Sequence, residues 1–121
     1  MTETDSASGA SPSALNREGL LDRVMGDEEL ANELVQDFLQ DAPAHVRALN
    51  EMIAAADVHG AERTAHFIKG AAAAIGADAM WEVALGLENA GKNGDMEALV
   101  AGAPALEVEL ERLRKAADAS G

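Results

Sequence analysis

Apolar residues recur every three or four positions through four long segments of this chain, which is the spacing of amphipathic α-helices. The stripe is most regular between residues 58 and 75. Its members there are Val58, Ala61, Ala65, Ile68, Ala72 and Ile75. Similar stripes run through about residues 28–56, 78–90 and 96–117. Because the predicted connections are short, successive helices are expected to pack as antiparallel neighbours.

The composition also favours helices around a single core. The 121 residues include one Trp, two Phe and no Tyr, and Ala is abundant while strand-forming runs of Val, Ile and Thr are absent. We therefore predict an all-α fold, an antiparallel four-helix bundle with a short extra N-terminal helix. The domain is expected to span residues 15–118, with a disordered tail over residues 1–14 and a short C-terminal tail over residues 119–121.

Caps and glycines predict where the helices begin and end. Asp27, Asp57 and Asp95 each precede an apolar stripe, where a carboxylate accepts hydrogen bonds from first-turn amides. Gly76 ends the stripe that begins at Val58, because glycine readily adopts the left-handed conformation of a helix C-terminus. Leucines between about residues 16 and 25 predict the short N-terminal helix.

Two prolines predict irregularities. Pro43 lies inside the second stripe, where it removes a backbone donor and crowds the preceding turn. We expect a kink or a short break near residues 41–43, which leaves open one bent helix or two helices end to end. Pro104 lies inside the last stripe, and because proline is tolerated in a first helical turn, a regular helix is expected to begin near it.

Charge and missing motifs limit the classes of function. The formal net charge is −13, from 22 acidic and 9 basic residues, which disfavours binding to nucleic acid or to anionic membranes. The chain has no Cys, no apolar run long enough to span a bilayer and no signal-peptide pattern at its start. We expect a soluble cytoplasmic protein. A phosphate-binding glycine loop is also absent, so the chain is not expected to draw on ATP by itself.

One histidine stands out from the helical pattern. At about 100° per residue, His66 points roughly 130° away from the centre of the stripe and should face solvent. Lys69 and Gly70 follow one turn later on the same side. A glycine inside a helix costs about 1 kcal/mol relative to alanine, and the next four residues are all Ala. The pattern indicates that space is needed beside the histidine.

An exposed helical histidine is usually an ordinary surface residue, and Lys69 alone is an ordinary solvated charge. Together, however, these residues meet the needs of a phosphoryl acceptor. A neutral imidazole nitrogen is the nucleophile, Lys69 can pair with phosphoryl oxygens, and Gly70 leaves room for a bulky donor.

The local pattern resembles the histidine-phosphotransfer (HPt) domains of phosphorelays in two-component signalling. The pattern reads His66, a hydrophobic residue, Lys69 and Gly70, followed by Gly76-Ala77. Further matches across about residues 16–116 are Gly26-Asp27, Leu30, Phe38, Leu39, Pro43, Leu87-Glu88 and Gly94-Asp95. The resemblance implies that His66 is phosphorylated on its outer ring nitrogen, that Lys69 assists phosphate binding, and that Glu88 bonds the inner ring nitrogen.

The resemblance implies a phosphocarrier rather than an enzyme, without a cofactor or kinase activity of its own. It would accept a phosphoryl group on His66 from a response-regulator receiver aspartate and relay it to another receiver domain, with a hybrid histidine kinase as a further possible partner. No nucleic acid, membrane or metal is implied, and a monomer is expected. The alternative is a helical bundle that docks a receiver domain without phosphotransfer, and a small metal-dependent hydrolase is a more distant alternative.

Other residues near the motif allow more than one interpretation. Phe67 stands where relatives commonly have a small or polar residue, so it either contacts a partner or is covered by the N-terminal helix. Lys92 resembles a second basic residue that some relatives place near the phosphate. Docking is expected around His66, with a further possible contribution from Leu20, Leu21 and Val24. His45 and His59 are expected to be bystanders, since His59 and His66 are about 10 Å apart along the helix axis, too far to chelate one metal ion.

Overall fold

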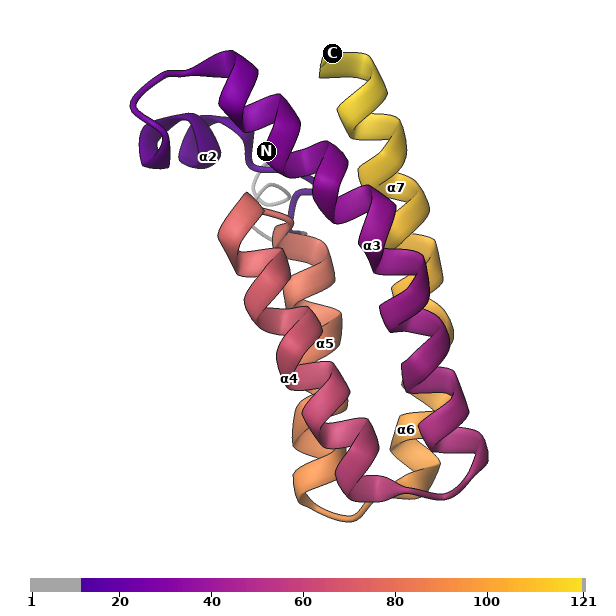
Figure 1. Cartoon of the computed structure of the whole chain (residues 1–121). Coiled ribbons are helices and arrows are strands. Elements are labelled where there is room, and N and C mark those ends of the chain that lie inside the picture. Colours follow the sequence, from indigo (N-terminus) through magenta and orange to yellow (C-terminus); the bar gives the residue numbers. More distant parts are fainter. Residues whose placement is uncertain (1–11, 121) are drawn as a thin grey trace, which may run out of the picture.

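The computed structural model describes residues 12–120, in which helices are joined by short turns and irregular segments, with no strand. The elements are α2 (Arg17–Arg23), α3 (Glu28–Ala54), α4 (Val58–Ile75), α5 (Asp78–Lys92), α6 (Met96–Gly102) and α7 (Pro104–Ser120). Helices α3, α4, α5 and α7 run alongside one another as a bundle, and α2 lies across one end (Figure 1). The predicted class, an antiparallel four-helix bundle with an extra N-terminal helix, is therefore confirmed.

The capping residues are placed as the sequence predicts. Asp27, Asp57 and Asp95 each accept a hydrogen bond from a backbone amide in the first turn of the helix that follows. Gly76 adopts the left-handed conformation that ends α4, with a φ of 78°. Its carbonyl also accepts a hydrogen bond of 2.7 Å from the Asn16 amide. The C-terminus of α4 is thereby tied to the chain that leads into α2.

The two prolines have different effects on the helices. Pro104 opens α7 directly after α6 ends at Gly102, as predicted. Pro43 lies within the continuous helix α3, so the alternative of two helices end to end is wrong. The helix continues because Leu39, Ala42 and Val46, on both sides of the proline, are all buried in the core. Their burial offsets the one backbone hydrogen bond that proline removes.

The core contains one large side chain or more from nearly every helix. The largest fully buried side chains are Leu20, Leu49, Met80, Leu99, Leu106 and Leu113. Of the predicted N-terminal tail, residues 1–11 lie outside the described part of the chain. Within residues 12–14, the Ser13 carbonyl accepts a hydrogen bond of 2.9 Å from the Ala79 amide. At the other end, α7 continues to Ser120, beyond the predicted domain limit.

Helices α4 and α5 form the most extensive helix pair of the bundle. Small residues allow this close approach, since Ala61, Ala65 and Ala72 of α4 are fully buried. On α5, Gly91 is so close to α4 that an added Cβ would lie 2.7 Å from the Cβ of Glu62. Side chains that point from α5 toward α4 therefore have only a short distance to span before they contact α4. This short distance brings α5 side chains close to His66.

Candidate functional site

His66 lies on the outer face of α4, as its position relative to the apolar stripe predicts. Its side chain is 67% exposed, whereas its neighbours Ala65 and Ile68 are 0% and 3% exposed. The imidazole is therefore open to a large partner while its backbone is fixed by the buried side of the same helix.

Glu88 approaches the inner ring nitrogen of His66 from α5. Its Oε2 lies 2.7 Å from the His66 Nδ1, and only 4% of its side chain is exposed. A carboxylate can only accept a hydrogen bond, so Nδ1 carries the proton in the neutral ring and donates it to Glu88. The outer nitrogen, Nε2, then keeps its lone pair and is the nucleophilic atom.

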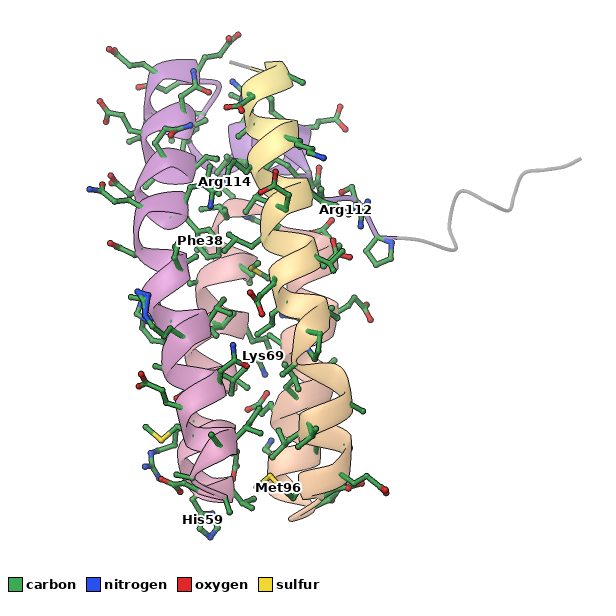
Figure 2. All side chains as sticks on the ribbon, turned by 90° about the vertical axis from the view of Figure 1, so that its right-hand side faces the viewer. Phe38, His59, Lys69, Met96, Arg112 and Arg114 are labelled. Carbon is green, nitrogen blue, oxygen red and sulfur yellow. The ribbon has the colours of Figure 1, made fainter. Side chains whose placement is uncertain are left out.

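Two ammonium groups surround the same carboxylate. The Lys69 Nζ lies 2.7 Å from Oε1 of Glu88, and the Lys92 Nζ lies 3.7 Å from Oε2. Among the described residues, none makes a hydrogen bond of good geometry to the buried Oε1, so its contact with Lys69 is an ion pair. Lys69 lies about midway along the bundle (Figure 2).

These contacts keep Glu88 charged although it is buried. The Lys69 ammonium is the largest cause of the lowering of the pKa of the Glu88 carboxyl to about 2; burial opposes this shift, and His66 and Lys92 add smaller lowering contributions. The two ammonium groups outnumber the single carboxylate, so these groups are together positive although the whole chain carries a net charge of −13. We refer to His66, Lys69, Glu88 and Lys92 as the charged cluster.

Gly70 leaves open space on the same face as His66. An added Cβ would have no heavy atom of a neighbouring element or side chain within 4 Å among the described residues. Internal packing therefore does not require glycine here, although a helix interior disfavours it. The open space at Gly70 permits the predicted clearance beside His66, which stays a prediction.

Phe67 lies on the side of His66 that faces α3, opposite the side that faces α5. Its ring contacts that of His45, with centroids 4.6 Å apart and planes inclined by 54°, yet Phe67 remains 55% exposed. The alternative in which the N-terminal helix covers it is excluded. His45 was expected to be a bystander, and its contact was missed because no periodicity within one helix reports a pair between two helices.

A hollow of about 210 Å³ lies between α3 and α4 beside these two rings. It is lined by Asp37, Phe38, Asp41, Ala42, His45, Val46, Phe67, Ile68, Ala71, Ala74, Ile75 and Met80.

Among the residues expected to aid docking, Leu20 is fully buried and therefore cannot contact a partner. It was misassigned because the short stripe of α2 does not by itself show which side faces the core.

His59 is separate from the charged cluster. Its side chain is 85% exposed and its only ion-pair contact in the described part of the chain is Glu62, at 3.9 Å. It lies at the end of the bundle, far from Lys69 (Figure 2).

Within residues 12–120, no group of three or more His, Cys, Asp or Glu side chains could hold a metal ion. In the same range, no helix combines the length and apolarity that crossing a membrane requires.

Comparisons with known proteins agree with the geometry. A family model described as Hpt domain matches residues 33–116, a range that contains all four residues of the charged cluster. Among solved structures, the histidine-containing phosphotransfer protein B (HptB) from Pseudomonas aeruginosa PAO1 is 22% identical, with a TM-score of 0.81 over 88% of this chain and 93% of that chain. At this identity, the structural likeness supports the fold alone. No match was found among curated proteins.

Proposed function

This chain belongs to the Hpt domain family, which makes it a histidine phosphotransfer protein of a phosphorelay, and we propose that His66 is its phosphoryl-accepting residue. The observation that carries this assignment is the 2.7 Å contact between the His66 Nδ1 and the Glu88 carboxylate. It leaves the exposed Nε2 as the acceptor and provides a counter-charge for the ring when a phosphoryl group is attached.

The transfer follows from this arrangement. The Nε2 lone pair attacks the phosphorus of an aspartyl phosphate on a receiver domain. A bond forms between Nε2 and phosphorus, the bond between phosphorus and the aspartyl oxygen breaks, and the aspartate leaves as a carboxylate. The Nδ1 proton remains on the ring and is shared with Glu88, and the reverse reaction passes the group to another receiver domain.

The lysines complete the proposed site. Lys69 lies one turn after His66 on α4, and Lys92 lies one turn after Glu88 on α5. Both ammonium groups can pair with the oxygens of a phosphoryl group on His66, because each lies beside the Glu88 carboxylate, which contacts the imidazole. Gly70 keeps the approach of the donor free of side chains.

We propose a phosphocarrier without kinase activity, which acts as a monomer in the cytoplasm. Its partners are response-regulator receiver domains, a hybrid histidine kinase, or both. The alternative is a bundle that docks receiver domains without accepting phosphate.

A labelling experiment separates these two functions. The wild-type chain is incubated with its host's receiver domains, each loaded with radioactive phosphate. We expect acid-labile, base-stable label on the wild type and none on His66→Gln. His59→Gln is the matched control, since His59 is also exposed and lies on the same helix, and it should accept label normally. Label that persists on His66→Gln contradicts the site assignment, and docking without label on any variant supports the non-catalytic alternative.

A further inference from the structure

The hollow between α3 and α4 owes its shape to a row of side chains on α4. Phe67, Ala71 and Ala74 are spaced four and three residues apart, so they follow one another along one side of the helix. The two alanines are too small to reach α3, and the space of about 210 Å³ is left open above them. We call this hollow the α3–α4 groove.

The end of the groove nearest His66 is formed by the two rings of Phe67 and His45. A phenyl ring that is 55% exposed leaves apolar surface in contact with water, although the ring is already held in place by its contact with His45. A large aromatic side chain presented in this way, next to an apolar hollow, is typical of an anchor for a bound protein.

The rim of the groove carries negative charge. Asp37 and Asp41 lie one turn apart on α3, and both are exposed. Among the described residues that line the groove there is no Lys or Arg. An apolar group flanked by a positive charge therefore matches the groove better than an apolar group alone, or one flanked by a negative charge, does.

The groove also adjoins the reacting imidazole, because Phe67 directly follows His66. A specific protein interface covers about 800 Å² on each partner, which is far more than one imidazole. A receiver domain close enough to exchange a phosphoryl group with His66 therefore extends over the neighbouring end of the groove.

We propose that the α3–α4 groove takes up an apolar side chain of the receiver domain that exchanges phosphate with His66, and that Asp37 and Asp41 pair with a basic residue beside it. This inference rests on the proposed function of His66. It assigns the choice among receiver domains to Phe67, His45 and the two aspartates, and not to the charged cluster.

The test compares two phosphate donors of different size. One donor is phosphoramidate, which is too small to touch the groove and labels His66 with loss of ammonia. The other is the phosphorylated receiver domain of the host that transfers fastest to the wild type. For Phe67→Ala, we expect the ratio of the receiver rate to the phosphoramidate rate to fall at least tenfold, through a raised KM for the receiver. Phe67→Leu should recover part of this ratio, because it restores apolar bulk.

Val108→Ala is the matched control, since Val108 is 57% exposed and lies on α7, and it should leave the ratio unchanged. The double variant Asp37→Asn, Asp41→Asn should lower the receiver rate severalfold and weaken its dependence on salt concentration. An unchanged ratio in Phe67→Ala overturns the apolar contact, and unchanged salt dependence overturns the ionic contact. If neither phosphoramidate nor the receiver domain labels the wild type, the proposed function itself is refuted.

Discussion

The two sides of His66 are built from different kinds of interaction. On the side of α5, a buried carboxylate contacts the imidazole and two ammonium groups. On the side of α3, an exposed phenyl ring borders an apolar groove with a negative rim. In the proposed function, one side determines which ring nitrogen reacts, and the other presents a surface that a partner recognises.

This separation has a physical reason. The tautomer of an imidazole depends on one hydrogen bond with correct geometry, so the group that makes it must be held rigidly and sheltered from water. Recognition of a partner requires the opposite, which is surface that remains unsatisfied until the partner arrives. The comparison therefore predicts that substitutions on the two sides affect different steps.

The largest effect is expected from Glu88→Ala. It removes a hydrogen bond to a charged group, which contributes about 1.5–3 kcal/mol, so phosphorylation should slow by about 10- to 100-fold. Because the defect lies in the chemistry, phosphoramidate and a receiver domain should be affected alike. Glu88→Gln should lose less, since its amide oxygen still accepts from Nδ1. A defect seen only with the receiver domain would place Glu88 on the recognition side.

Two glycines test how rigidly the α5 side is held. Gly91→Ala places a Cβ 2.7 Å from the Glu62 Cβ and 2.9 Å from its Cα, so α4 and α5 must separate, and stability should fall by about 1–3 kcal/mol. Gly70→Ala meets no such contact among the described residues and should stabilise the protein by up to about 1 kcal/mol. Denaturant unfolding measures both. If the two changes had the same sign, the contrast between fixed interface and open surface would be lost.

Lys69→Ala should have a smaller effect on the rate, a slowing of about tenfold, since Lys92 remains near the phosphate. It should also change the acid titration. The pKa of Glu88 is lowered to about 2 from 4.5, mainly by Lys69, so the carboxylate contributes stability above pH 4.5 that is lost as the pH falls toward 2.

Without Lys69, the pKa of Glu88 should rise, so less stability is contributed at neutral pH and the loss begins at higher pH. Carbon-13 NMR of the Glu88 carboxyl follows this directly, with Lys69→Arg as the control that keeps the charge. An unchanged pKa in Lys69→Ala would show that another group keeps the carboxylate charged.

Much of the fold could be predicted from the sequence because it depends on local signals. The stripe from Val58 to Ile75 sets the buried side of α4, and the Asp57 cap and Gly76 fix its ends. From these, the outward position of His66 follows by geometry. Pro43 shows the limit of local reasoning, because the burial of its neighbours decides that α3 continues through it.

The site could be predicted only in part. The pairing of Glu88 with His66 was implied by family resemblance, and no periodicity within this sequence reports it. The ion pair between Lys69 and Glu88 and the contact between His45 and Phe67 also join different helices, so the packing of α4 on α5 and on α3 had to be known first. Leu20 was misassigned to the surface for the same reason.

Nitrogen-15 NMR of the imidazole rings in the phosphorylated protein tests the central claim most directly, because it distinguishes the two ring nitrogens of each histidine. The claim is that Glu88 accepts a hydrogen bond from protonated Nδ1 of His66, so that Nε2 is the nitrogen that is phosphorylated. We expect phosphate on Nε2 of His66, with Nδ1 still protonated, and unmodified rings at His45 and His59. Phosphate on Nδ1 of His66, or on another histidine, would contradict the account.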